Sequence, residues 1–184
     1  MTALYGLADL AIGTGDNVTT LRLFDGPLDL SWKHCAMTSD FVAEFVALRY
    51  RGSRSLYKEV RHNVGYLTNE LIENAVKFRA SGEIMIEASV TDTAFRTKVS
   101  NYVDKQTAER FQRLLSEITA GEPGDLLIER IEANAAGDAS GSGLGLLTLM
   151  SDYGAHFAWV FGSNGEDSIP LETYASIAVP DPSN

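Results

Sequence analysis

A run of small residues late in the chain constrains its fold more than any other feature. Residues 135–143 read Ala-Ala-Gly-Asp-Ala-Ser-Gly-Ser-Gly, and side chains this small cannot pack a hydrophobic core. Residues 144–152 then resume the 3.6-residue spacing of apolar side chains, which predicts a helix directly after the glycines. Glycines let backbone amides approach an anion closely, and a helix N-terminus favours negative charge. We therefore expect Gly141–Leu146 to bind an anion such as a phosphate, although flexible loops without a ligand have a similar composition.

A second motif lies on a helix predicted over about residues 55–78. Glu70, Asn74 and Lys77 are spaced i, i+4 and i+7, so they share one side of that helix. The Asn carbonyl suits a hydrated magnesium ion, the Lys suits a phosphate, and the Glu can orient or deprotonate an attacking group. The same row is also typical of a solvated helix face, so it supports a site only in combination with the glycine-rich loop.

Strands and helices alternate along the rest of the chain. Hydrophobic periodicity and turn residues predict strands over about 18–24, 83–90, 94–101, 155–162 and 169–179, and helices over about 38–51, 104–119 and 125–134 in addition to the two above. The helix over 38–51 is expected to begin at a cap formed by residues 38–40, and Gly52 to end it. This order predicts one domain over residues 1–184, an α/β two-layer sandwich in which helices cover one face of a mixed sheet.

Charge and composition exclude several classes of partner. The chain has 15 basic and 25 acidic residues, a net charge of -10, which repels nucleic acid and anionic membrane surfaces. Apolar runs are far shorter than a membrane helix of roughly 20 residues. With one cysteine, no internal disulfide is possible, and no signal peptide opens the sequence, so we expect a cytoplasmic protein.

Taken together, the two motifs resemble those of a known superfamily. Glu70-x-x-x-Asn74-Ala75, followed by Gly141-x-Gly143-Leu144-Gly145-Leu146, is similar to the N-box and second glycine box of the GHKL ATPases, which include histidine kinases and anti-sigma-factor kinases. The similarity spans roughly residues 60–155 and implies the Bergerat (GHKL) form of the α/β sandwich. In size the chain is most similar to stand-alone serine kinases that act on anti-sigma-factor antagonists.

The resemblance implies a role for each motif residue. Asn74 corresponds to the magnesium ligand, Glu70 to the catalytic base and Lys77 to a phosphate contact. The phosphate-binding loop corresponds to Gly141, Ser142, Gly143, Leu144 and Gly145, and residues 121–140 to a lid over the nucleotide. The implied ligand is ATP or ADP with Mg²⁺. The implied partner is a small protein of the STAS or anti-sigma-antagonist type, or another signalling domain, and a homodimer is common among such relatives.

One departure from the family pattern leaves a second reading open. Family members carry an Asp-x-Gly-x-Gly box after the second strand of the central hairpin, whereas this chain has no glycine there. Asn101 stands where the family's Asp would be, and Tyr102 is expected near the mouth of the pocket. An amide both donates and accepts hydrogen bonds, so it could face adenine or a different planar heterocycle. The alternative is therefore a non-catalytic sensor that binds a flavin, FMN or FAD.

Overall fold

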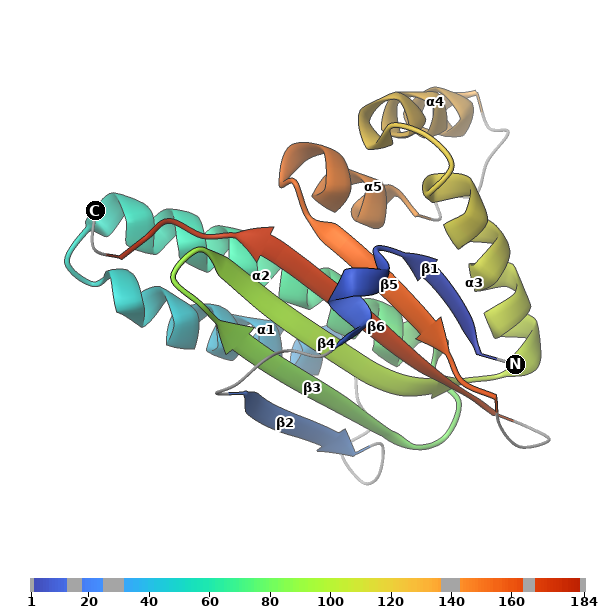
Figure 1. The fold of residues 1–184 in the computed structure, drawn as a ribbon, viewed down its shortest axis with the longest axis horizontal. Coiled ribbons are helices and arrows are strands. Elements are labelled where there is room, and N and C mark those ends of the chain that lie inside the picture. The colour runs from blue at the N-terminus through green and yellow to red at the C-terminus, as the bar shows by residue number, and fades with distance from the viewer. Residues whose placement is uncertain (1, 13–17, 25–31, 137–142, 164–167, 183–184) are drawn as a thin grey trace.

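The computed structural model describes residues 2–12, 18–24, 32–136, 143–163 and 168–182, and within these ranges the chain is an α/β protein (Figure 1). The strands are β1 (Ala3–Gly6), β2 (Thr19–Phe24), β3 (Glu83–Val90), β4 (Ala94–Val103), β5 (His156–Phe161) and β6 (Ile169–Ala178). The α-helices are α1 (Trp32–Ala47), α2 (Arg54–Phe78), α3 (Lys105–Ile118), α4 (Pro123–Ala135) and α5 (Leu144–Asp152), with short 3-10 helices η1 (Ala8–Ile12) and η2 (Leu48–Tyr50). None of the helices in these ranges has the length and apolarity needed to span a bilayer.

The six strands form one sheet in the order β1-β5-β6-β4-β3-β2, and every pairing between them is antiparallel. The prediction of a mixed sheet is therefore wrong. Helices α3, α4 and α5 connect β4 to β5, and these two strands do run in the same direction. They are not neighbours, however, because β6 returns from β5 and pairs with both of them. The chain thus has the helical connection expected of a parallel pair without forming one.

Side chains on one face of the sheet form the floor of a hydrophobic core. Along β4 the odd-numbered residues are buried and the even-numbered ones are more exposed, as the two-residue period of a strand requires. Ile86, Val99 and Trp159 lie in one row across the sheet, together with Thr173. Figure 1 shows α1 and α2 side by side on the far face of the sheet, and the buried stripe of α2 packs there. This arrangement fixes which side of α2 remains available to a ligand.

The N-terminal part of α1 differs from the sequence prediction. Helix α1 begins at Trp32 and not at the proposed cap near Thr38. The Thr38 hydroxyl donates to the carbonyl of His34 at 2.8 Å, and the Ser39 hydroxyl donates to that of Ala36 at 2.9 Å. Both hydroxyls therefore bond back to the preceding helical turn instead of capping free amides. The remaining elements match their predicted ranges to within a few residues, and β1 and η1 were not predicted.

Candidate functional site

A cleft of about 610 Å³ lies where the two sequence motifs meet. Helix α2 forms one wall, α3 forms another, the first turn of α5 closes one side, and strands β4, β5 and β6 supply the floor. The volume is in the range of sites that bind cofactor-sized ligands, roughly 300–1,000 Å³. The cleft combines apolar floor residues with charged groups on its walls, a composition suited to a ligand with a flat ring and an anionic tail.

The polar row of α2 faces this cleft. Glu70, Asn74 and Lys77 all line it, as expected from their spacing, and Glu73 joins them at its rim. Asn74 is partly buried, whereas Lys77 is exposed and its ammonium lies 5.0 Å from the centre of the Phe78 ring. The opposite side of α2 is held in the core, so the helix presents this row as a fixed unit.

The glycine-rich motif reaches the same cleft from α5. Gly143 caps the helix with φ +88°, a conformation that favours glycine, and a side chain there would press on Leu114 of α3. Gly145 lies so close to Glu70 that an added Cβ would overlap the carboxylate. Gly143 and Gly145 line the cleft, and Leu144 is partly buried without lining it. Gly141 and Ser142 lie outside the described residues.

The environment of Glu70 is unusual for a surface carboxylate. Burial raises the pKa of Glu70, and the neighbouring charge of Glu73 raises it further. Because the carboxylate also lies against the first turn of α5, it is held next to the place where the glycine motif would bind an anion. A carboxyl group with a raised pKa in a cleft is typical of functional sites, since it binds a proton more readily than an exposed one.

The floor of the cleft holds three polar side chains among apolar ones. Asn101 is 5% exposed, and its Nδ2 makes a long hydrogen bond of 3.4 Å to the Tyr102 carbonyl. Thr173 is also buried and lines the cleft. Trp159 is fully buried, stacks on Phe157, and its indole Nε1 has no hydrogen-bond partner among the described residues. A buried donor without a partner is rare in folded proteins, and a ligand acceptor would satisfy it.

Tyr102 does not belong to the cleft. It follows Asn101 along β4, so its side chain points to the opposite face of the sheet, where its ring packs against Gly82. The expectation that Tyr102 lies near the mouth of the pocket is therefore wrong, and the reason is the strand alternation itself. Of the two neighbouring residues, only Asn101 can meet a ligand in the cleft.

Three arginines that the sequence analysis did not single out line the cleft opposite α2. Arg110 and Arg113 lie three residues apart on α3 and have no ion-pair partner within the described ranges. Arg130 of α4 forms an ion pair with Glu117 at 2.6 Å. With Lys77, four of the chain's 15 basic residues thus surround this cleft, in a molecule of net charge -10. The i, i+3 spacing on α3 was visible in the sequence, but its direction towards α2 depends on the tertiary fold.

Two further expectations from the sequence are a metal ion bound by Asn74 and a lid over residues 121–140. No cluster of three or more His, Cys, Asp or Glu side chains suited to a metal is found in the part of the chain that the structure describes. The only side-chain oxygen proposed as a metal ligand is that of Asn74. The predicted lid over 121–140 contains α4, and through Arg130 this helix contributes to the cleft. Residues 137–140 of the predicted lid lie outside the described ranges.

No protein-family model matches the chain, and no curated protein sequence matches it.

Proposed function

We propose that the chain is a nucleotide-binding regulatory protein of the GHKL type, with the two-layer Bergerat fold, and that it acts as an ATP-dependent serine kinase on a small partner protein of the anti-sigma-antagonist type. The observation that carries the proposal is the meeting of Glu70 and Asn74 on α2 with Gly143 and Gly145 at the start of α5, in one cleft. These residues are far apart in sequence, and a nucleotide site of this kind requires them together.

The walls and floor suit the two ends of a nucleotide. The apolar floor with Asn101, Thr173 and Trp159 would hold the planar base, since rings pack on apolar surfaces and their polar edges need buried partners. The amides of the first turn of α5 would bind phosphate oxygens, with Lys77, Arg110 and Arg113 supplying positive charge. The lining also includes the carboxylates of Glu70, Glu73 and Glu117, and Arg130 is paired with Glu117, so Lys77, Arg110 and Arg113 are the cations that would face the phosphates.

Magnesium fits the residues that are present. Mg²⁺ is usually bound by one or two protein oxygens together with substrate phosphates and waters, so a dedicated cage of carboxylates is not required. Asn74 would supply the protein oxygen. The ion would neutralise phosphate charge during transfer. Glu70 would accept the proton of the attacking serine hydroxyl, for which its raised pKa is suited.

A second candidate function is a non-catalytic flavin sensor that binds FMN or FAD in the same cleft. The observation that favours it is the chemistry of the floor, which carries an amide at Asn101, where the GHKL pattern has a carboxylate, and an indole N–H at Trp159 without a partner among the described residues. Donors of this kind suit the carbonyl oxygens and ring nitrogens of an isoalloxazine as well as those of a purine.

Calorimetric titration with ATP in the presence and absence of Mg²⁺ tests the proposal. We expect magnesium-dependent binding by the wild type and its loss in Asn74→Ala, because the triphosphate would lack its bound counter-ion. Asn63→Ala, on the same helix but outside the cleft, is the matched control and should bind as the wild type does. ATP affinity that is the same in Asn74→Ala would refute the magnesium role. A visible absorption band in the purified protein, or binding of FMN or FAD without ATP binding, would favour the sensor.

A further inference from the structure

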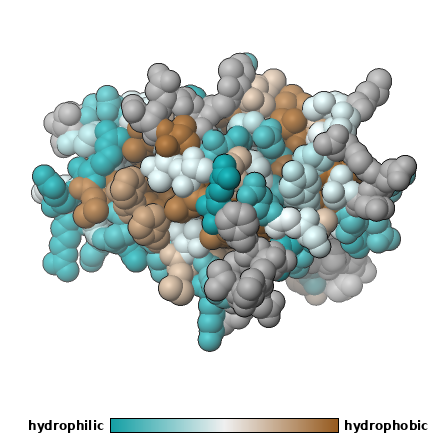
Figure 2. All heavy atoms as spheres, turned by 90° about the horizontal axis from the view of Figure 1, so that it is seen from below, coloured by the Kyte–Doolittle hydropathy of each residue, from teal (hydrophilic) through white to brown (hydrophobic). Residues whose placement is uncertain are grey.

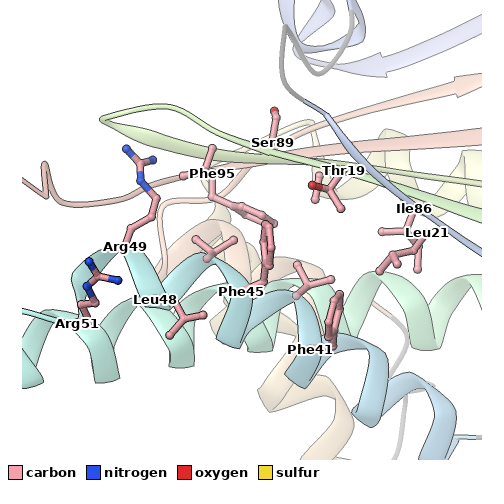
Figure 3. A pocket seen from close by; sticks show the side chains of 14 residues that line it. Thr19, Leu21, Phe41, Phe45, Leu48, Arg49, Arg51, Ile86, Ser89 and Phe95 are labelled. Carbon is pink, nitrogen blue, oxygen red and sulfur yellow. The ribbon is translucent and has the colours of Figure 1, made fainter.

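A second hollow, separate from the nucleotide cleft, lies between α1 and the edge of the sheet at β2 and β3 (Figure 3). We call it the α1 groove. It measures about 520 Å³ and shares no lining residue with the cleft described above. Figure 3 shows Phe41 and Phe45 of α1 below the sheet, on the side of Leu21 and Ile86, with Leu48 of η2 at the end near Arg49. The groove therefore has two apolar walls from different elements.

The α1 groove leaves large apolar side chains in contact with solvent. Phe41 and Phe45 are 54% and 55% exposed, and their rings are stacked with centroids 6.2 Å apart. Leu48, one turn further on, is exposed as well. Figure 2, which views the molecule from the β2 side, shows hydrophobic side chains reaching the surface between hydrophilic ones. Apolar patches of this kind commonly mark contact with another molecule, because they remain costly to hydrate.

The charges at the α1 groove are all of one sign. Arg49 and Arg51 lie at one end of it, and its described lining includes no acidic residue. Arg49 is already hydrogen-bonded to Thr91 and paired with Asp92, whereas Arg51 has no ion pair with a described residue. In a chain of net charge -10 this is a basic end on an apolar groove. The matching surface is one that joins apolar side chains to acidic ones.

Helix α4 carries such a surface on its outer side. Ile128 and Ile131 are 58% and 52% exposed and lie next to each other on the helix, three residues apart. Asp125, Glu129 and Glu132 are exposed and follow the same side of the helix as a second row. The outer face of α4 is thus an apolar ridge bordered by acids, the complement of an apolar groove with a basic end.

We propose that the α1 groove binds the outer face of α4 from a second copy of this chain. The two surfaces cannot meet within one molecule, because α4 lies at one side of it and α1 with β2 at the other (Figure 1). Each copy therefore offers one groove and one α4, and the contact is head-to-tail, which generates an open chain or a ring. A contact between one helix face and one groove is expected to be small, so association should depend strongly on protein concentration. Since Arg130 of α4 also lines the nucleotide cleft, the contact would place a neighbouring copy on a helix that contributes to that cleft.

Sedimentation velocity over a wide range of protein concentration tests this proposal. The wild type is expected to sediment as species that grow with concentration. Phe45→Asp places a charge in the groove, and Ile131→Asp places one on the apolar ridge of α4. Each should raise the dissociation constant at least about tenfold, as loss of a central apolar contact typically does. Both side chains are more than half exposed, so both variants are expected to fold, which circular dichroism checks.

Mixing the two variants gives the sharper result. Phe45→Asp retains its α4 and Ile131→Asp retains its groove, so an equal mixture should form a dimer of one copy of each and no larger species.

A charge reversal tests the basic end of the groove. Arg51→Glu should weaken association, and Glu132→Arg in the partner copy should restore it. Arg54→Glu, which is exposed on α2 outside the groove, is the control. A wild type that stays monomeric at every concentration overturns the proposal. Association that neither Asp variant weakens also overturns it, because the interface would then lie elsewhere on the molecule.

Discussion

Glu70 lies partly buried in the cleft with its carboxylate against the first turn of α5. A variant at this residue can therefore distinguish phosphoryl transfer from nucleotide binding. Replacing it by Gln keeps the shape and removes the proton acceptor. General bases contribute about 10²–10⁴-fold in rate, so Glu70→Gln should lower transfer of radiolabelled phosphate to a serine partner by that order while ATP affinity changes little. Glu59→Gln, on the same helix but outside the cleft, is the control. Equal turnover in wild type and Glu70→Gln would remove Glu70 from the mechanism.

The same variant has a second readout in stability. The pKa of Glu70 is raised by burial and then by Glu73. A carboxyl group whose pKa is higher in the folded state than in the unfolded state stabilises the fold while it is protonated. This stabilisation is complete below the unfolded-state pKa, and it is lost as pH rises through the folded-state pKa. At neutral pH the charged group therefore opposes folding. Glu70→Gln should melt at a higher temperature than the wild type at pH 7, and the difference should disappear near pH 4, close to the unfolded pKa of about 4.3. Identical melting curves at both pH values would contradict this.

Trp159 gives a test of the cleft floor. Its indole N–H has no partner among the described residues, so Trp159→Phe removes a donor without breaking a known hydrogen bond. If a ligand acceptor bonds to this donor, the variant should lose roughly five- to tenfold in affinity for ATP or for a flavin, the value of one net hydrogen bond. The free energy of unfolding without ligand should change less than the free energy of binding. Removal of an unsatisfied buried donor stabilises the fold, and this offsets the packing that the smaller Phe ring loses. Undiminished affinity in titrations of the folded variant would exclude Trp159 from ligand recognition.

At the scale of elements, the approach of α5 to α2 places Gly145 against the end of the Glu70 side chain. An added Cβ at Gly145 would overlap the Glu70 carboxylate, so Gly145→Ala should force the two helices apart or turn Glu70 aside, and lower both melting temperature and nucleotide affinity. Gly124→Ala is the control, since its Cβ would make only an ordinary contact, 3.6 Å from the Ser151 hydroxyl. Adding Glu70→Ala to Gly145→Ala should recover the melting temperature, because the overlapping carboxylate is gone. Failure of that rescue would show that another contact sets the helix spacing.

The sequence predicted most elements because their signals are local. The periodicity of α2 and the strands β3 to β6 follow from the alternation of apolar residues, and the row of Glu70, Asn74 and Lys77 follows from helical geometry. The start of α1 was missed because Thr38 and Ser39 have the composition of a cap, and only the fold shows that their hydroxyls bond to the preceding turn.

Cleft residues that lie on elements other than α2 were harder to predict from the sequence. Arg110 and Arg113 point towards α2 only because of where α3 packs, and Trp159 resembles any buried aromatic until its unpaired nitrogen is seen. Tyr102 was misplaced for the opposite reason, since strict strand alternation, applied to Asn101, already excludes its neighbour from the same face. Side-chain direction was therefore predictable within an element and not between elements.

At the scale of the whole molecule, strand order escapes prediction because it is decided by long-range pairing. The insertion of β6 between β4 and β5 converts an expected parallel pair into two antiparallel ones. It also places Asn101, Thr173 and Trp159 on three adjacent strands of one face. The cleft floor is therefore a product of this topology, and neither hairpin alone would assemble it.

The charge distribution of the whole molecule leads to a last prediction, in which salt raises the melting temperature of the free protein and reduces the increase that a bound ligand adds. A ligand that binds only the folded state at about 100 times its dissociation constant adds about 2.7 kcal/mol of stability, roughly 5–11 °C in melting temperature for a chain of this size. We expect such a shift with Mg-ATP, and a much smaller one in Asn74→Ala.

With a net charge of -10 the free protein repels itself, so added salt should raise its melting temperature. The same salt screens the four cleft cations from the phosphates, so at fixed nucleotide concentration the ligand-induced shift should shrink. Differential scanning fluorimetry across a salt series measures both quantities. A shift that is independent of salt would place the bound ligand away from these cations, and the absence of any shift with ATP, FMN or FAD would contradict a nucleotide site in this cleft.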